Sequence, residues 1–218
     1  MRQHRNHTNC HRRRHRHCRE TDVNLLIPEG AKKIVLAGNP NTGKSLFFNF
    51  LTGVYVEVSN YPGTTLEISS GRYGNDIVFD TPGVYGLSSF NDEERVARDV
   101  ILGADLVLNV VDAVHLERDL FLTQQIIDTG IPVVIALNMM DEAENQNIKI
   151  DIARLADLLG VPVIPTVAVQ KKDLHKVAQA LPQARRGRIT PELQQRLEEY
   201  LPKTAGNQGD ALLILEGD

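Results

Sequence analysis

The residues Gly38-Asn39-Pro40-Asn41-Thr42-Gly43-Lys44-Ser45 follow directly after the apolar run at 33–37 and decide the fold. Two glycines allow the backbone to turn its N–H groups inward, which forms a concave nest suited to an anion. The helix expected after the loop points its positive N-terminal end at the same place. Lys44 can reach β- and γ-phosphates, and the hydroxyl of Ser45 is a hard oxygen ligand for Mg²⁺. The stretch therefore predicts a site for a phosphate and Mg²⁺.

A glycine-rich turn without a ligand is the simpler explanation of such a loop. The residues on either side argue against it, because 33–37 reads as a buried strand and the apolar run at 46–51 predicts a helix. A phosphate loop needs this strand before it and this helix after it. Gly53 is placed to end the helix near Thr52.

Length and composition indicate an ordinary globular chain. The 218 residues allow one domain with a small appendage. Hydrophobic residues at 42% and charged residues at 24% exclude general disorder and a fibrous class. No apolar run approaches the roughly 18 to 20 residues of a membrane helix, and no apolar segment of a secretory signal follows the basic start. We therefore expect the chain as given to be soluble.

Residues 1–24 read as a separate basic tail. Its first 20 residues hold seven arginines and one acid, whereas the remainder of the chain has a net charge of −10. Cys10, Cys18 and five of the seven histidines also lie there. Thiolate and imidazole suit Zn²⁺, but the spacing matches no standard ligand pattern and the arginines would repel a cation. We expect a disordered, anion-attracting arm, with a metal site and a mistaken translation start as alternatives.

Residues 54–65 read as a mobile loop, since Asn60, Pro62 and Gly63 are turn residues and no periodicity is clear. The interest of this loop is Thr65, whose hydroxyl could close over a γ-phosphate and its Mg²⁺. Thr64 is a rival for the same role.

The next two strands are predicted at 66–73 and 77–79, joined by a turn too short for any but an antiparallel pairing. The second strand ends at Asp80-Thr81-Pro82-Gly83. A carboxylate at a strand end can hold a Mg²⁺-bound water, and the N–H of Gly83 can contact a γ-phosphate. A β-turn is the usual explanation of Asp-x-x-Gly, but its distance from the phosphate loop favours a nucleotide site.

Three further strands are predicted at 106–111, 131–137 and 161–165, and helices before and between them end near 102, 128 and 159. A last helix is expected at 171–181. His115 lies at a strand end, where a helix-start residue is a better interpretation than a catalytic base. A segment at 88–102 is expected to begin as a second mobile loop and continue as a helix.

The strand at 131–137 ends at Asn138-Met139-Met140-Asp141. The carboxylate of Asp141 can accept from guanine N1–H and the exocyclic amine, whereas adenine has no matching donors on that edge. Asn138 can bond the base and brace the phosphate loop. Asn and Asp at strand ends are otherwise common helix caps. The loop at 166–170 lies where a backbone N–H could reach guanine O6.

Beyond Pro182 the sequence changes character. A basic link at 185–188 leads to Thr190-Pro191-Glu192, which is typical of a helix start, and a polar helix through Tyr200 follows. Residues 210–218 also look helical. These pieces are too few to enclose a core, so we expect them to dock elsewhere or to belong to an incomplete element. The arginines are interpreted as a solvated linker rather than a nucleic-acid site.

Four motifs follow one another along the chain: 38–45, Thr65, 80–83 and 138–141. In this order they resemble the translation-factor-like class of P-loop GTPases, and more narrowly the N-terminal G domain of the ferrous iron transport protein B (FeoB) family. The narrower resemblance rests on 38–41 with 46–49, on 58–67, and on 80–87. It implies a three-layer α/β P-loop GTPase fold at 25–182, with a mostly parallel six-stranded sheet that has one antiparallel strand, and a partial helical extension at 183–218.

The motifs together assign a nucleotide site. Its contacting residues are expected to be Gly38, Asn39, Pro40, Asn41, Thr42, Gly43, Lys44, Ser45, Gly63, Thr64, Thr65, Asp80, Thr81, Pro82, Gly83, Asn138, Met139, Met140, Asp141, Val167, Ala168 and Val169. The two methionines are expected to pack rather than to act as ligands. Val167 stands where the family usually has Ser, so the guanine loop is atypical.

The expected reaction is hydrolysis of GTP to GDP and phosphate, with Lys44, Thr65, Gly83 and Asn41 in catalytic roles. Mg²⁺ would be held by Ser45, Thr65 and Asp80. Many such enzymes place a glutamine after Asp-x-x-Gly, but this chain has Val84. Similar GTPases with an apolar residue there can recruit K⁺, and the resemblance implies Asn41 as its ligand. We therefore expect slow, potassium-stimulated turnover.

The resemblance further implies a membrane transport domain that moves Fe²⁺ into bacteria, at the cytoplasmic face of the inner membrane, and a small FeoA-type partner protein. A homo-oligomer is a further expectation. A switch module with incidental hydrolysis is one alternative. An RNA- or ribosome-associated GTPase is another, but the acidic body argues against it and no nucleic-acid partner is expected.

Overall fold

The computed structural model describes residues 30–53, 56–61, 64–88, 91–204 and 208–216. Its sheet has the strand order β2-β3-β4-β1-β5-β6-β7. In chain order the strands are β1 (Lys33–Ala37), β2 (Val56–Asn60), β3 (Glu67–Tyr73), β4 (Asp76–Asp80), β5 (Leu106–Asp112), β6 (Val133–Asn138) and β7 (Val163–Pro165). The predicted basic tail and its possible metal site lie outside the described residues.

The sheet is mostly parallel, as predicted, and β3 is the strand that runs against its neighbours. β1 pairs in parallel with β4 on one side and β5 on the other, while β3 pairs antiparallel with both β2 and β4. The prediction of six strands was wrong, because the described structure contains seven. The additional strand is β2, which lies within the segment predicted to be a loop.

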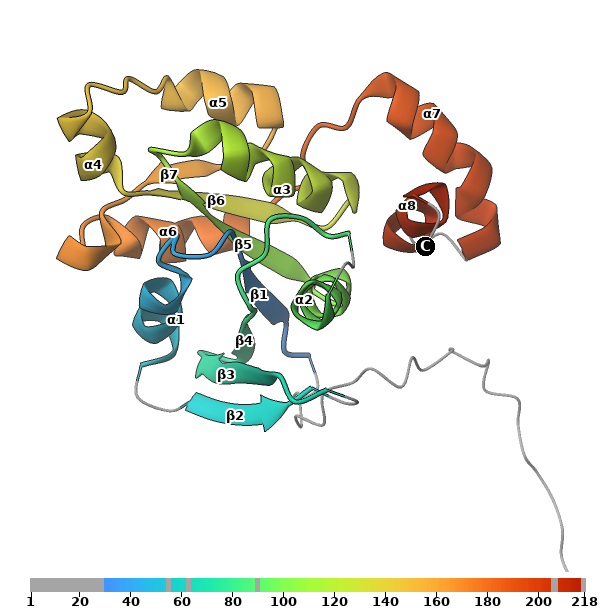
Figure 1. Cartoon of the computed structure of the whole chain (residues 1–218), viewed down its shortest axis with the longest axis horizontal. Helices are drawn as coiled ribbons and strands as arrows, with labels where there is room; N and C mark the ends of the chain where they lie inside the picture. Colours follow the sequence, from blue (N-terminus) through green and yellow to red (C-terminus); the bar gives the residue numbers. More distant parts are fainter. Residues whose placement is uncertain (1–29, 54–55, 62–63, 89–90, 205–207, 217–218) are drawn as a thin grey trace, which may run out of the picture.

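The helices are α1 (Lys44–Thr52), α2 (Asp92–Leu102), α3 (Leu116–Asp128), α4 (Met140–Asn145), α5 (Ile152–Leu159), α6 (Leu174–Ala180), α7 (Pro191–Tyr200) and α8 (Gln208–Glu216). The boundaries lie close to the predicted ones, apart from α4, which the patterns did not predict. Figure 1 shows α1 and α6 on one side of the sheet and α2 and α3 on the other.

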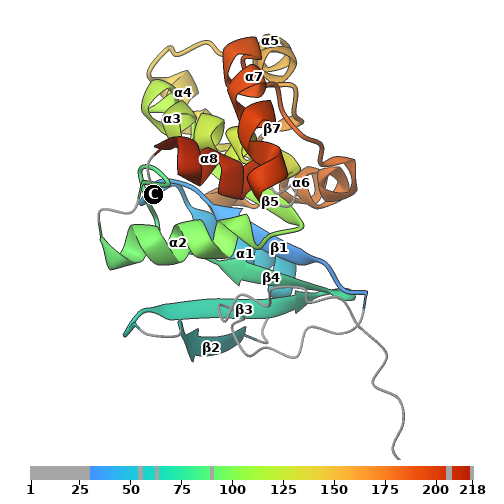
Figure 2. The same cartoon turned by 90° about the vertical axis from the view of Figure 1, so that its right-hand side faces the viewer.

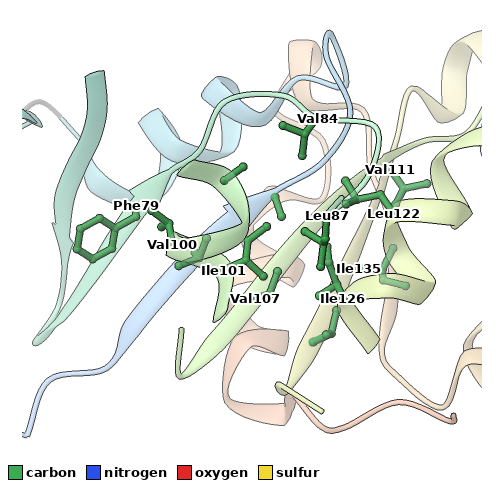
Figure 3. Packing of buried hydrophobic residues seen from close by; sticks show 14 of the residues in the cluster. Phe79, Val84, Leu87, Val100, Ile101, Val107, Val111, Leu122, Ile126 and Ile135 are labelled. Carbon is green, nitrogen blue, oxygen red and sulfur yellow. The ribbon is translucent and has the colours of Figure 1, made fainter. Parts of the chain in front are cut away.

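Two apolar cores lie on the two faces of the sheet, which confirms the three-layer arrangement. Phe47, Phe48 and Leu51 of α1 belong to the core on one face, together with residues of β1, β4 and β5. On the other face the core includes Phe79, Val84, Ile101 and Ile126, among others drawn in Figure 3. Because β5 and β6 are buried on both faces, their sequences are continuous apolar runs rather than alternating ones.

The C-terminal helices α7 and α8 lie beside the α2 and α3 side of the domain, away from β2 and β3, in both views (Figures 1 and 2). Thr190 caps α7 by accepting from Leu193 N, as predicted for this start. Contrary to expectation, the two helices enclose a small apolar cluster of their own around Leu197, Ala211 and Leu212. They also dock, since the Gln208 amide donates to the carbonyl of Asp128 at 2.9 Å.

Among the residues that the structure describes, no helix combines the length and apolar character that a membrane span requires.

The two edge strands of the sheet differ from each other. β2 has mostly exposed side chains, whereas β7 is short and ends at Pro165.

Candidate functional site

The phosphate loop joins β1 to α1, and both of its glycines are required by the space around them. A Cβ on Gly38 would stand 2.3 Å from the carbonyl oxygen of Val110 in β5. Gly43 has a φ of +90°, and a Cβ there would lie 2.7 Å from the Asn138 side-chain nitrogen. The loop is thus pressed against the carboxyl ends of β5 and β6. Only glycine fits these two positions.

Lys44 is buried inside the loop, where its ammonium group donates to the carbonyls of Gly38 at 3.1 Å and Asn39 at 3.0 Å. Burial lowers the pKa of Lys44, while the nearby carboxylates of Asp80 and Asp119 act in the opposite direction. The nitrogen of the lysine side chain thus lies inside the phosphate loop, close to two acids.

Ser45 at the start of α1 and Asp80 at the end of β4, two of the three residues predicted to hold Mg²⁺, lie together. The Ser45 hydroxyl donates to Asp80 Oδ2 at 3.2 Å. Burial raises the pKa of Asp80, against the opposing effects of Lys44 and of the Ser45 hydrogen bond. Among the described residues, Asp80 Oδ1 is buried without a hydrogen-bond partner. Hard oxygen ligands and an unpartnered carboxylate oxygen fit a divalent cation such as Mg²⁺.

The segment after β4 folds back onto the phosphate loop. A Cβ on Gly83 would lie 2.7 Å from Pro40 Cα and 3.0 Å from Lys44 Nζ, and Val84 N donates to the Gly38 carbonyl at 3.3 Å. The Thr81 hydroxyl points the other way, donating to the Leu36 carbonyl at 2.8 Å. Thr81 therefore supports the strand, and Gly83 is the residue of this motif that lies against the loop.

The two candidate threonines differ in their surroundings. The Thr64 hydroxyl is used within its own turn, since it donates to the Tyr61 carbonyl at 3.2 Å and accepts from Leu66 N at 3.2 Å. The side chain of Thr65 is exposed. The local turn thus occupies Thr64 and leaves Thr65 as the better candidate for a metal ligand. Gly63 lies outside the described residues.

Asn138 connects the base motif to the phosphate loop, as predicted. Its side-chain nitrogen donates to the Thr42 carbonyl at 2.9 Å, and its Oδ1 accepts from Ala168 N at 2.9 Å. One buried amide therefore holds the loop at 38–45 and the loop at 166–170 in a fixed relation.

Asp141 lies at the start of α4 and accepts from the Gln170 amide at 3.2 Å. It lines a cavity of about 760 Å³ whose other walls include Met140, Val167 and Gln170. Met140 packs against the core on the α2 and α3 side, as the sequence suggested. The Val169 side chain is 75% exposed.

Two further expectations concern His115, which follows β5, and the pair Asn41 and Val84. His115 precedes α3, and its Nδ1 lies 2.7 Å from Asp112 Oδ2, so it belongs to the helix start as interpreted. Asn41 has a left-handed φ of +64° and an exposed side chain in the phosphate loop. Val84 is 2% exposed, and Figure 3 shows it within the apolar cluster.

A family model described as ferrous iron transport protein B matches residues 32–181. The chain belongs to the FeoB family. The Fe(2+) transporter FeoB of Escherichia coli (strain K12) is 42% identical over 158 residues, which cover 68% of this chain and 20% of that protein. The chain therefore spans about one fifth of the length of such FeoB relatives.

Solved FeoB structures have the same fold. A GDP-bound mutant of the S. thermophilus FeoB G-domain is 38% identical, with a TM-score of 0.77, and the match covers 86% of this chain and 79% of that one. A mutant N-terminal FeoB portion from S. thermophilus bound to GDP and AlF₄⁻ is 38% identical, with a TM-score of 0.73 and coverage of 86% and 80%. The FeoB match and the α/β fold agree with the resemblance seen in the sequence.

The FeoB motifs did not by themselves reveal every residue that contacts the site. Asp119, Gln125 and Gln170 were not predicted. Asp119 bonds Asn39 of the phosphate loop at 2.6 Å, and Gln125 accepts from Leu87 N at 2.9 Å. An acid in the first turn of a helix is explained by the helix dipole alone, so the sequence carries no separate signal for the contact of Asp119.

Proposed function

We propose that this chain binds GTP with Mg²⁺ and hydrolyses it to GDP and phosphate. The observation that carries the proposal is the connection of three motifs by short contacts: Asn138 to Thr42 at 2.9 Å, and Ser45 to Asp80 at 3.2 Å. These contacts bring the residues that we assign to phosphate, Mg²⁺ and base to one edge of the sheet, where parallel sheets bind ligands. The GDP and GDP·AlF₄⁻ complexes of the S. thermophilus relatives support it.

Each residue has a role that follows from its position. Lys44 would exchange its two backbone carbonyl partners for β- and γ-phosphate oxygens. Ser45, Asp80 and Thr65, the last with an exposed side chain, would hold Mg²⁺ directly or through a water. When bound, Mg²⁺ neutralises charge on the phosphates. The backbone N–H of Gly83 would contact the γ-phosphate from the side of Pro40.

The apolar residue after Gly83 determines how the attacking water could be handled. The Val84 side chain is 2% exposed and packs in the core, so it cannot orient a water. We infer that K⁺ takes the place of the absent glutamine by supplying a positive charge. Asn41, which is exposed in the phosphate loop, would offer an oxygen ligand to K⁺. Replacing Na⁺ by K⁺ is expected to accelerate phosphate release by the wild type and to have little effect on Asn41→Ala. Equal responses would refute the assignment.

Guanine selectivity is assigned to Asp141. Asp141→Asn replaces a carboxylate by an amide, which can donate to the C2 carbonyl of xanthine but no longer accepts two hydrogen bonds from guanine. The variant is expected to lose GDP affinity and to gain affinity for xanthosine diphosphate. Equal GDP affinity of Asp141→Asn and wild type would contradict the assignment. Glu142→Gln is the matched control, because Glu142 is an exposed acid of α4 that does not line the cavity.

The activity of the whole transporter is a proposal as well. We propose that GTP binding and hydrolysis drive or regulate Fe²⁺ uptake through an associated membrane domain, with this chain at the cytoplasmic face of a bacterial inner membrane. The E. coli relative is an Fe(2+) transporter, which supports this. Iron uptake by cells that carry Lys44→Ala in the full transporter tests it, since uptake equal to wild type would separate transport from the nucleotide site.

A further inference from the structure

Asp119 is a buried carboxylate in the first turn of α3, and it contacts the phosphate loop directly. It is 2% exposed. Its Oδ1 accepts from the Asn39 side-chain nitrogen at 2.6 Å and from Arg118 Nε at 2.9 Å. Its Oδ2 accepts from the backbone N–H of Asp112, the last residue of β5, at 3.0 Å. One carboxylate therefore joins a helix, the end of a central strand and the phosphate loop.

Asn39 is held from two sides. Its side chain reaches Asp119, and it is buried, with 1% of its surface exposed. Its backbone carbonyl accepts from Lys44 Nζ at 3.0 Å and from the Thr42 hydroxyl at 3.0 Å. The residue whose side chain Asp119 fixes is thus the same residue whose carbonyl lies against the lysine of the phosphate site.

We propose that Asp119 is a positioning residue for the phosphate loop. It acts through the Asn39 side chain to hold the first turn of the loop in the shape that accepts a nucleotide. The inference rests on the proposed function, because the quantity that Asp119 controls is nucleotide affinity. A charged acceptor suits this task, since hydrogen bonds to ionised groups are shorter and roughly twice as strong as neutral ones.

The effect of removing the carboxylate follows from its partners. In Asp119→Ala the Asn39 amide and the Asp112 N–H lose their acceptor in a buried place, and the first turn of the loop is free to shift. We expect the GDP dissociation constant to rise by about tenfold, the size that a lost hydrogen bond to a charged group produces. Glu117→Gln removes a negative charge from the exposed face of the same helix turn and is expected to leave affinity unchanged.

A conservative variant distinguishes positioning from general support of the fold. Among the described residues, Asn39 Oδ1 is buried without a partner. In Asp119→Asn the new amide can therefore donate to Asn39 Oδ1 after that side chain turns over, while its oxygen still accepts from Asp112 N–H. Asp119→Asn is expected to keep GDP affinity within about threefold of wild type, given the modest net strength of a neutral hydrogen bond.

The experiment measures GDP affinity by calorimetry in Mg²⁺ buffer, on the full chain and at a temperature where thermal unfolding curves show every variant folded. A double-mutant cycle adds Asn39→Ala and the Asn39→Ala, Asp119→Ala double variant. If Asp119 acts through Asn39, the double variant binds GDP no more weakly than the weaker single variant.

Three outcomes are decisive. Weak binding by Asp119→Ala, recovery in Asp119→Asn and a non-additive cycle support the inference. Wild-type affinity in a folded but less stable Asp119→Ala overturns it, because the carboxylate then supports the fold alone. Additive losses overturn the route through Asn39. Failure of the wild type itself to bind GDP refutes the proposed function, and that result is separate from any difference between variants.

Discussion

Replacing Asn138 by alanine is expected to destabilise the protein and to weaken nucleotide binding together. The Asn138 side chain is 3% exposed. It donates to the Thr42 carbonyl at 2.9 Å and accepts from Ala168 N at 2.9 Å, with a longer contact of 3.4 Å from the Thr166 hydroxyl. Asn138→Ala removes both short bonds at once.

The magnitude follows from what is left behind. Each hydrogen bond contributes about 0.5–1.5 kcal/mol net, and a buried group left without a partner costs about 1–3 kcal/mol. The carbonyl of Thr42 and the N–H of Ala168 are both stranded, although water entering the space left by the amide offsets part of the cost. We expect a loss of about 2–4 kcal/mol in the free energy of unfolding, a large part of a typical domain's stability.

Urea unfolding followed by circular dichroism measures this loss, and Asn145→Ala on the exposed face of α4 is the matched control. GDP affinity is measured on the same samples below the unfolding transition. A loss under 1 kcal/mol would refute the reasoning, because it would mean that the two loops keep their places without this amide. A large loss of stability with wild-type GDP affinity would refute the part that links the amide to the phosphate loop.

Three other predictions concern neighbouring positions. Gly83→Ala is expected to reduce phosphate release by at least about tenfold, because a Cβ 2.7 Å from Pro40 Cα meets backbone that cannot yield; single-turnover kinetics test this, and wild-type rates would contradict it. Asp80→Asn is expected to raise stability without nucleotide at pH 7. Burial raises the pKa of Asp80 in the folded state. The wild type therefore loses stability as the pH rises above the unfolded pKa of about 3.9, because Asp80 must then ionise in a buried place. Urea unfolding measures the stability of Asp80→Asn relative to wild type, and a gain that does not shrink near pH 4 would argue against this. The pKa of Tyr61 is raised to about 12, mainly by burial and further by Asp99. Ultraviolet titration to pH 10.5 should therefore ionise as many tyrosines in wild type as in Tyr61→Phe. If the variant ionises one tyrosine fewer than wild type, the prediction is wrong.

The site was more predictable than the outer parts of the sheet. Parallel strands bring their carboxyl ends to one edge, so motifs that follow β1, β4 and β6 must meet there once the strands are recognised. The bond from Asn138 to Thr42 and the bond from Ser45 to Asp80 are direct results of this geometry. Residue type at a strand end therefore carried most of the information.

The missed strand β2 shows what such patterns leave out. Its burial is almost uniformly low, with Val56 39% and Val58 56% exposed. Its sequence alternates only over the four residues Val56-Glu57-Val58-Ser59, and the turn residues beside this short run suggest a loop. The strand forms by antiparallel pairing with β3, the next strand along the chain, and a pattern within 54–65 alone does not show that pairing.

Three contacts that the sequence did not predict all involve α3. Asp119 at its start holds Asn39 of the phosphate loop, and Gln125 in its middle accepts from Leu87 N of the segment after Gly83. Near its end, the carbonyl of Asp128 accepts from Gln208 of α8. A helix is stiff over this length, so a shift of the segment around Leu87 must either break its bond to Gln125 or move α3. In the second case the phosphate loop and the C-terminal helices are displaced together, because both are bonded to the same helix.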